Sequence, residues 1–566
     1  MRKYVASVMA LLLLLTIVPV YAASAASQVT VKVNGTQVQF SDVQPYEKNG
    51  IPMVPLRAVA EQLRLNVSFD QTTQQILLTR PGLLVAFKSG SKEARVGQVK
   101  LTFSPAVSSI KNRVYVPLTF FEQVLGLTTK YDKTAHTASI TAPIVEPEDF
   151  VEEVVKLLQA GKHQELIDRY FADIAKPSIT AENLGTIWKQ FNTAAGQFVE
   201  VIEVFSETID LNTQLTEAHL KFDNAIYKFV FPMNSIDQLL GFQITPLPID
   251  AQLPQTVIEE EVTVGKGTDY ELGGTLTLPK GASGPVPAIV LVHGSGPSDR
   301  DESGLGFKTF RDLAYGLAEQ GIAVLRYDKR TFAYGASFSP LEAAQLTVKE
   351  ETVDDAILAS KLLKSDKRID AEKVYIAGHS LGGLLAPRID AQGGDFAGLV
   401  LLAGSPRNLW EIFHDQWTDL VAEMNPNDPA KAVTKAWVAA EYAKAKTIAD
   451  MSDAEAASTT VFQIPALYYK EMDSHSAADY AAQLTKPVLV LQGESDFQVY
   501  ADNDYIRWQE LFKNKSNASF KLYPSMNHFF VEYDGPGAGT RQEYLLPGLV
   551  SQKVIDDIAS WILKQK

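Results

Sequence analysis

The 566-residue sequence contains no cysteine. That absence excludes a disulfide framework, a thiolate metal site and a cysteine nucleophile, so any covalent catalysis must use another side chain. Basic residues are also in deficit, with 52 Lys and Arg against 67 Asp and Glu, and the formal net charge is −15. Because nucleic acids and anionic membranes attract cationic surfaces, this balance argues against a general role on either.

Common metal and cofactor motifs are missing as well. The chain has eight histidines, no His-Glu-x-x-His, no phosphate-binding loop and no Cys–His cluster, so we expect neither a metal nor a cofactor. Apolar residues make up 46% of the chain. That fraction is enough to offset the entropy of ordering, and the length is typical of three or four folded domains.

The N-terminus has the features of an export signal. Two basic residues precede an apolar run from Val5 to Val20, and Ala23-Ser24-Ala25 fits the pattern of small residues that signal peptidase reads. The run is shorter than the ~20 residues that span a bilayer, and no other segment is apolar enough to do so. We therefore predict a signal peptide at 1–25, no transmembrane anchor after its cleavage, and a secreted, extracellular or cell-envelope location. Export without disulfides favours a bacterial product.

The next segment, 27–142, contains an internal repeat. A Val-Pro-Leu sequence precedes a predicted short helix at both Pro55 and Pro117, and an aspartate follows in each copy, at Asp70 and Asp132. Self-similarity at a fixed period indicates duplicated structural units. Each unit is predicted to contain a strand, a turn into a short helix, and further strands.

This repeat resembles the N-terminal stalk domain of copper amine oxidases, which is common on secreted bacterial proteins. The resemblance implies a structural module, with the cell envelope as a partner that it would contact. It does not imply copper, because His136 is the only histidine of the segment and one histidine makes no metal site.

A middle segment is predicted at 148–246, between two proline-containing linkers. Apolar residues at helical spacing come first, and alternating apolar residues at 198–204 and 225–231 then indicate strands. This order predicts a small α+β domain. It resembles a domain of unknown function with the cone shape of nuclear transport factors, found before secreted bacterial hydrolases, and we interpret it as an accessory domain.

The third segment, 256–566, is predicted to have an α/β fold with a mainly parallel sheet. Its short apolar runs are typical of strands that are buried on both faces, and the spacing between them leaves room for crossover helices. The runs are Ala288–Val292, Ile322–Leu325, Val374–Ala377, Leu399–Leu402 and Val488–Leu491. Ligands of such sheets bind at the carboxyl ends of the strands, so polar residues there are candidates for function.

One strand end carries Gly378-His379-Ser380-Leu381-Gly382, which is a Gly-x-Ser-x-Gly pattern. Flanking glycines permit the tight turn that presents a serine hydroxyl to a pocket. The pattern also arises by chance, but here it follows a predicted buried strand and precedes a predicted helix, which is the context that the motif requires. We predict Ser380 as a nucleophile.

A second strand end carries His293-Gly294-Ser295-Gly296. Glycines allow backbone N–H groups to approach a ligand closely, as an oxyanion hole requires. We predict one donor at the N–H of Leu381 and the other at the N–H of Ser295, with Gly296 as the alternative. For His293 we favour a role in ordering this loop beneath the pocket over a role as the base.

The acid and the base are expected after the serine in chain order. Asp496 follows the strand that ends at Leu491, and Glu494 competes with it for the role of acid. His528 follows the strand-like Phe520–Tyr523 and is the predicted base. In this interpretation Asp496 orients His528, which accepts the proton of the serine.

The segment now resembles an α/β-hydrolase, whose nucleophile, acid and histidine occur in this order. The strand end at His293, with Asp299-Arg300-Asp301 after it, is similar to secreted esterases and dienelactone-hydrolase-like members. One position departs from that pattern: Thr331 stands where relatives usually have glycine, which would reshape a loop beside the pocket. Asp328, Lys329 and Arg330, just before it, are interpreted as a structural charge cluster.

An insertion at about 406–483 is predicted to form a helical lid. Trp410, Phe413 and Trp417 recur near helical spacing there. They either line the substrate pocket or pack the lid onto the domain, since apolar helical stripes are usually core. The lid as a whole favours an apolar acyl or aromatic substrate.

The leading functional hypothesis is a secreted serine hydrolase that cleaves a small-molecule carboxylic ester through an acyl-enzyme. A serine peptidase of the aminopeptidase or prolyl oligopeptidase type is the alternative enzyme, because the same three residues serve amides. A non-catalytic envelope-binding protein that has kept the hydrolase fold is the alternative from a different class.

Overall fold

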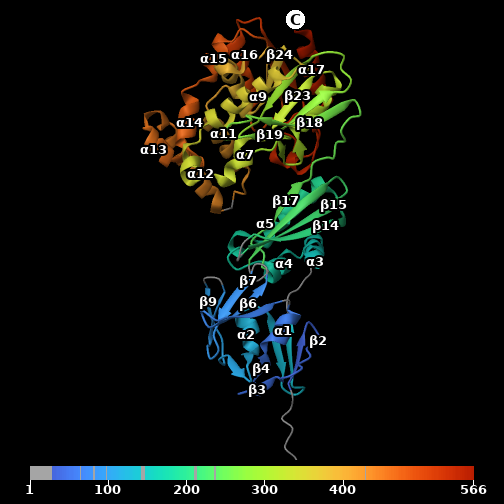
Figure 1. Ribbon diagram of the computed structural model, residues 1–566, viewed down its shortest axis with the longest axis vertical. Coiled ribbons are helices and arrows are strands. Elements are labelled where there is room, and N and C mark those ends of the chain that lie inside the picture. Colours follow the sequence, from blue (N-terminus) through green and yellow to red (C-terminus); the bar gives the residue numbers. More distant parts are fainter. Residues whose placement is uncertain are drawn as a thin grey trace, which may run out of the picture. The chain divides into compact units, whose positions relative to one another are not determined.

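Figure 1 shows the computed structural model of the chain. It describes residues 29–63, 65–80, 83–96, 99–141, 147–209, 213–234, 238–426 and 429–565. The predicted signal peptide lies outside these residues. Across the described ranges, we find no helix that combines the length and apolar character needed to cross a membrane.

The chain divides into two compact units, and the division passes through the predicted middle segment. The second unit contains Asn183–Ile202, His219–Phe229 and the chain from Gln243 onward. The predicted domain boundaries therefore stay predictions, and each segment is described by itself.

The N-terminal segment is β-rich, and its duplicated units pair with each other. Each copy has a short helix that starts directly after its Val-Pro sequence, and the preceding strands β4 and β11 lie antiparallel with Val54 opposite Val116. The two repeat aspartates close the following hairpins by accepting a backbone N–H two residues on, Asp70 from Thr72 and Asp132 from Thr134. The elements are β1 (Thr30–Val33), β2 (Thr36–Gln37), β3 (Tyr46–Lys48), β4 (Ile51–Pro55), α1 (Leu56–Gln62), β5 (Asn66–Asp70), β6 (Gln75–Arg80), β7 (Leu83–Phe87), β8 (Glu93–Val96), β9 (Val99–Thr102), β10 (Ser108–Ile110), β11 (Arg113–Pro117), α2 (Leu118–Gln123), β12 (Thr128–Asp132) and β13 (Thr137–Thr141).

The middle segment has helices followed by strands, as its sequence predicts. Its strands form one sheet in the order β14-β15-β16-β17. The elements are α3 (Pro147–Gln159), α4 (His163–Tyr170), α5 (Ala181–Ala195), β14 (Phe198–Thr208), β15 (Thr213–Phe222), β16 (Ile226–Asn234) and β17 (Gln243–Pro246).

The C-terminal segment is built on an eight-stranded sheet in the order β18-β19-β23-β20-β24-β25-β28-β29. The six strands from β23 to β29 along this order pair in parallel, and β19 pairs antiparallel with both β18 and β23. The predicted α/β class is confirmed. The strands are β18 (Val257–Val264), β19 (Leu272–Pro279), β20 (Val286–Val292), β23 (Ala323–Tyr327), β24 (Ile369–His379), β25 (Leu399–Leu402), β28 (Val488–Gly493) and β29 (Ala518–Tyr523).

Both faces of this sheet are covered, which explains why its strands are continuously apolar. In β20 the side chains alternate: Val290 belongs to the core on one face, which includes residues of helices α9, α10 and α16, and Leu291 belongs to the core on the other, which includes residues of α6 and α17. These helices are α6 (Thr309–Glu319), α9 (Asp354–Ser365), α10 (Leu381–Ile389), α16 (Ile506–Phe512) and α17 (Gln552–Lys564).

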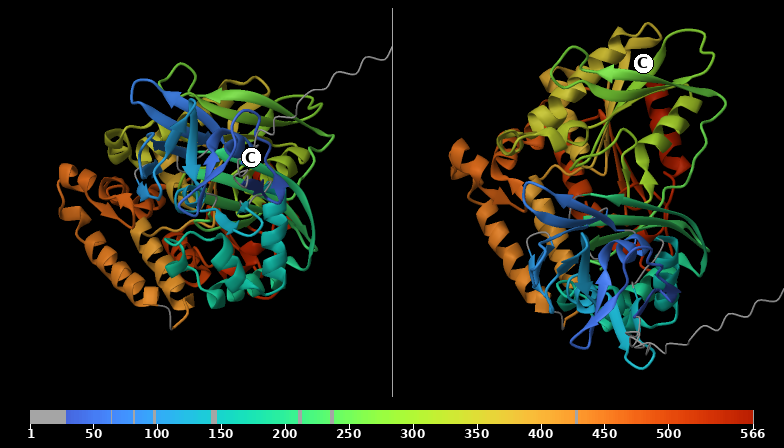
Figure 2. Two further views of the ribbon diagram at one scale, coloured as in Figure 1. Left: turned by 90° about the horizontal axis from the view of Figure 1, so that it is seen from below. Right: turned by 60° about the horizontal axis from the view of Figure 1, so that its bottom comes forward.

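The predicted helical insertion lies between strands β25 and β28. Figure 2 shows its orange helices beside the sheet. The insertion comprises α11 (Leu409–Glu423), α12 (Pro429–Ala445), α13 (Asp453–Ser458), β26 (Thr460–Val461), β27 (Ile464–Pro465), α14 (Ala466–Asp473) and α15 (Ala477–Gln483). Two short helices, α7 (Arg330–Tyr334) and α8 (Pro340–Gln345), and the hairpin of β21 (Ser303–Gly304) and β22 (Phe307–Lys308) complete the segment.

Candidate active site

Ser380 occupies a sharp turn between strand β24 and helix α10. Its backbone has φ 53° and ψ −113°, which is strained for a residue with a side chain. The neighbouring glycines make the turn possible, because a Cβ at Gly378 would lie 2.0 Å from the Gly382 carbonyl oxygen, and one at Gly382 would lie 2.2 Å from that of Val292. The Ser380 side chain stays partly exposed at the carboxyl edge of the sheet.

Asp496 and His528 lie together at the same edge, after strands β28 and β29. The Nδ1 atom of His528 is 2.7 Å from Oδ2 of Asp496, and both side chains are buried. Asp496 also accepts hydrogen bonds from the Gln492 side chain at 2.8 Å and from the backbone N–H groups of Gln498 and Val499 at 2.8 and 3.0 Å. The competing carboxylate, Glu494, is exposed.

These contacts define the tautomer of His528. A carboxylate accepts, so Nδ1 must carry the proton, and Nε2 of the neutral ring is then left as an acceptor. The same carboxylate would stabilise the imidazolium if Nε2 gained a proton.

His379, the residue before Ser380, links the serine turn to the histidine loop. Its Nε2 donates to the backbone carbonyl of His528 at 3.0 Å, and its Nδ1 lies 3.0 Å from Oε2 of the buried Glu302. Burial by itself would lower the pKa of His379, but the carboxylate of Glu302, the carbonyl of His528 and the charge of Asp496 together raise that pKa above its ordinary value. His379 and Glu302 thus form an ion pair beneath the site.

Glu302 also fixes the glycine loop after strand β20. Its Oε1 accepts the N–H of Gly294 at 2.9 Å. Gly294 runs against the serine, since a Cβ there would lie 3.2 Å from Cβ of Ser380. The Glu302 carboxylate therefore contacts the glycine loop directly and the histidine loop through His379.

The predicted oxyanion donors lie on two elements beside the serine. Leu381 is the first residue of helix α10, where backbone N–H groups have no partner within the helix and the helix dipole is positive. Ser295 and Gly296 are exposed in the loop after β20, and Gly296 has φ +84°, a conformation that favours glycine.

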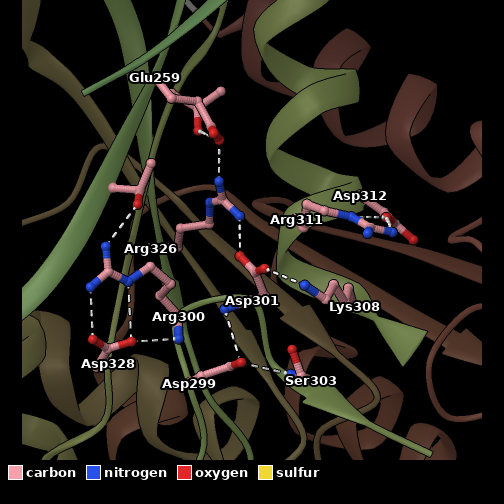
Figure 3. Close-up of polar contacts among 12 residues, drawn as sticks. Glu259, Asp299, Arg300, Asp301, Ser303, Lys308, Arg311, Asp312, Arg326 and Asp328 are labelled. Carbon is pink, nitrogen blue, oxygen red and sulfur yellow. Dashed lines mark hydrogen bonds and ion pairs between the residues drawn. The ribbon is translucent and has the colours of Figure 1, made fainter. Parts of the chain in front are cut away.

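A partly buried network of ion pairs holds the rest of that loop, as Figure 3 shows. Arg300 donates to both carboxylate oxygens of Asp328, from Nε at 3.1 Å and from Nη2 at 2.8 Å. Arg326 of strand β23 contacts Asp301 and Glu259. The Asp299–Asp301 sequence therefore anchors the loop to strands β18 and β23.

His293 and the lid aromatics were the predicted pocket residues. His293 is 1% exposed, burial lowers its pKa, and its Nε2 lies 2.9 Å from the Asp299 carbonyl oxygen, so it orders the loop. Trp410 donates to Asp473 at 3.0 Å, and the ring centroids of Trp417 and Trp437 are 4.8 Å apart. Phe413 faces Tyr469, with ring centroids 6.4 Å apart. All three lid aromatics pack inside the lid, and a role in the pocket stays a prediction.

No sequence pattern indicates the roles of Glu302 and His379. His379 is the variable position of the serine motif, and Glu302 is one of three acidic residues in a charged stretch, after Asp299 and Asp301. Their pairing depends on the neighbouring positions of strands β20 and β24. Among the described residues we find no group of three or more His, Cys, Asp and Glu side chains that could hold a metal ion.

Comparisons with known proteins agree with this architecture. The copper amine oxidase N-terminal domain family matches residues 32–140, and the alpha/beta hydrolase family matches residues 289–540. Esterase EstD of Thermotoga maritima is 33% identical over 390 residues, which cover 69% of this chain and 89% of that protein. Those 390 residues exceed the length of 256–566, so the similarity extends into the middle segment.

Solved structures of low identity also match. Est1E from Butyrivibrio proteoclasticus is 17% identical, with a TM-score of 0.34 over 54% of this chain and 98% of that one. An esterase of Pyrococcus furiosus is 14% identical, with a TM-score of 0.35 over 57% of this chain and 97% of that one. From the extent of its identity to EstD and its matching family model, the chain belongs to the α/β-hydrolase family, with an N-terminal domain of the copper amine oxidase N-terminal type.

Proposed function

We propose that this chain is a carboxylic ester hydrolase in which Ser380 is the nucleophile, His528 the general base and Asp496 the residue that orients the base. The observation that carries the proposal is the 2.7 Å contact between His528 and Asp496 at the sheet edge where the strained turn presents Ser380. The esterase relative supports an ester as the substrate class.

In the first half of the reaction, Oγ of Ser380 attacks the ester carbonyl carbon while Nε2 of His528 takes the hydroxyl proton. The carbonyl oxygen becomes an oxyanion, which the N–H groups of Leu381 and Ser295 would receive. When the tetrahedral intermediate collapses, His528 returns the proton to the leaving alkoxide. The alcohol departs and the acyl group remains on Ser380.

In the second half, a water molecule replaces the alcohol. His528 removes its proton as the water oxygen attacks the acyl carbon, and a second oxyanion forms at the same donors. Collapse returns the proton to Oγ of Ser380 and releases the carboxylic acid. The ester and one water molecule are consumed, and Ser380 and His528 return to their starting protonation states.

The direct test is the hydrolysis of p-nitrophenyl butyrate by the Ser380→Ala variant. Turnover should fall by roughly 10⁴–10⁶-fold, because the covalent route is removed. Ser365→Ala is the matched control, since Ser365 is exposed and precedes strand β24 whereas Ser380 follows it. Activity that survives in Ser380→Ala would overturn the assignment.

We also propose that residues 1–25 direct export and are removed after Ala25. The basic start, the apolar run and the small residues before the cut support this proposal. Intact-mass spectrometry of the protein from the medium or the envelope of an expressing bacterium should give a chain that begins at Ala26. A chain that keeps its first residues would contradict it.

A further inference from the structure

A buried lysine outside the catalytic triad contacts the glycine loop. Lys329 follows strand β23 and is 1% exposed. Its ammonium donates to the carbonyl oxygen of Gly294 at 2.9 Å and lies 3.4 Å from Oε2 of the buried Glu351. A buried ammonium is costly unless it is paired and hydrogen-bonded. The placement of this ammonium on the carbonyl oxygen of Gly294 therefore suggests a role at the glycine loop.

The contact fixes the orientation of the peptide that carries a predicted oxyanion donor. The carbonyl of Gly294 and the N–H of Ser295 belong to one planar trans peptide, so they point in opposite directions. A lysine that holds the carbonyl therefore sets the direction of the N–H. The N–H of Gly294 is held in turn by Glu302 at 2.9 Å, so buried charges of opposite sign clamp both sides of this glycine.

We propose that Lys329 is a positioning residue for the oxyanion hole, which orients and polarises the Gly294–Ser295 peptide for the negative charge that develops beside Ser380. This inference rests on the proposed esterase mechanism. An ammonium on the carbonyl oxygen draws electron density from the peptide, which makes the opposite N–H a stronger donor. Its positive charge also favours the oxyanion over the neutral ester, and only such differential stabilisation accelerates the chemical step.

Glu351 and two hydroxyl groups hold the lysine in place. Thr331 donates to Oε1 of Glu351 at 2.7 Å, and Tyr468 donates to Oε2 at 2.6 Å. Thr331 stands where the family resemblance leads us to expect glycine, and its hydroxyl supplies a bond that glycine lacks. Tyr468 belongs to helix α14 of the lid, so the lid and the glycine loop are joined through Glu351 and Lys329.

Lys329 could serve only as the counter-ion of Glu351, or it could also position the Gly294–Ser295 peptide. A pair of variants separates these two roles. Lys329→Met removes the ammonium but leaves a buried carboxylate unpaired, which is expected to destabilise the fold. Lys329→Met with Glu351→Gln removes both charges and keeps acceptors and donors for Thr331 and Tyr468. If Lys329 positions the peptide, the double variant folds normally and still hydrolyses esters slowly.

The measurements are kcat and KM for p-nitrophenyl butyrate and the inhibition constant of a trifluoromethyl ketone. Oγ of Ser380 attacks the carbonyl carbon of such a ketone, and the carbonyl oxygen becomes an oxyanion. The adduct therefore mimics the transition state. We expect kcat of the double variant to fall about 10–100-fold with KM nearly unchanged, since full loss of one oxyanion donor costs about 10²–10³-fold. The inhibition constant of the ketone should rise by a similar factor.

Lys515→Met is the matched control, because Lys515 also donates to backbone carbonyls, those of Ala481, Ala482 and Leu484, but precedes the amino end of strand β29. A double variant with wild-type kcat and ketone affinity would overturn the role of Lys329. Activity that does not depend on Ser380, by contrast, would overturn the proposed mechanism itself, so the two failures are distinguishable.

Discussion

At the scale of single residues, the site is defined by buried charged groups whose positions are over-determined. Asp496 accepts hydrogen bonds from three further groups besides its contact with His528, and Glu302 contacts both Gly294 and His379. Removing one partner of such a contact leaves an uncompensated buried group, which is more costly than the contact itself is favourable. Substitutions here should therefore have large and separable effects.

Glu302→Gln tests the connection beneath the site. Glutamine keeps an acceptor for the N–H of Gly294 but removes the charge that raises the pKa of His379. We expect kcat/KM for a small ester to fall about tenfold, mostly through kcat, since an effect of this size is within the usual range for misplaced catalytic groups. Glu494→Gln, at an exposed carboxylate, should leave both constants unchanged; equal effects of the two variants would argue against this role of Glu302.

Glu543 should make stability dependent on pH. Burial, together with the nearby charge of Asp496, raises the pKa of Glu543 to about 7, although the N–H of Gly539 opposes the shift. The Glu543 carboxyl binds its proton more tightly in the folded protein than in the unfolded chain. The stability that this proton contributes is therefore complete below about pH 4.5 and is lost as the pH rises through 7. At pH 8, Glu543→Gln should raise the free energy of unfolding by about 3 kcal/mol. Urea denaturation at pH 8 and pH 5 checks this, and an equal gain at both pH values would contradict it.

At the scale of elements, the strand ends bring distant residues into one site. The carboxyl ends of β20, β24, β28 and β29 supply the glycine loop, Ser380, Asp496 and His528. The continuous apolar runs predict five strands of the sheet, β20, β23, β24, β25 and β28, because strands buried on both faces have a clear sequence signature. The edge strand β18 lacks that signature, since Val257–Val264 contains three consecutive glutamates.

The same contrast applies to the site. Ser380 was found from a local motif, and Asp496 and His528 from their order after successive strands. No local pattern marks the contacts of Glu302 with His379 or of Lys329 with Gly294, because each joins residues from different loops. Such contacts exist only once the sheet order is set.

The lid aromatics give an element-scale prediction. The Trp417 and Trp437 rings are in contact between helices α11 and α12. Trp417→Ala should therefore lower the free energy of unfolding by about 2–4 kcal/mol, as expected for the loss of a large packed side chain. The order of preference along a series of p-nitrophenyl esters, from acetate to octanoate, should not change. A changed order with unchanged stability would instead place Trp417 in the pocket.

At the scale of the whole molecule, the candidate catalytic residues are confined to one part of the chain. All candidate catalytic residues lie after residue 290, and the family model of the N-terminal segment ends at residue 140. Deleting residues 27–141 should therefore leave kcat/KM for soluble p-nitrophenyl butyrate within about twofold of the full-length value. The reason is that no candidate catalytic residue lies in the deleted segment. Steady-state kinetics of the truncated and full chains checks this, and a tenfold loss in the folded truncated protein would show that the stalk takes part in catalysis.

If Ser380 forms the acyl-enzyme, a covalent serine-hydrolase inhibitor should react at that residue. The protein is treated with a fluorophosphonate, digested, and mapped by mass spectrometry while residual esterase activity is followed. We expect one phosphonyl adduct per chain on the peptide that contains Ser380, formed in step with the loss of activity and absent from Ser380→Ala. An adduct on another residue with equal loss of activity, or full activity in the chain labelled at Ser380, would contradict it.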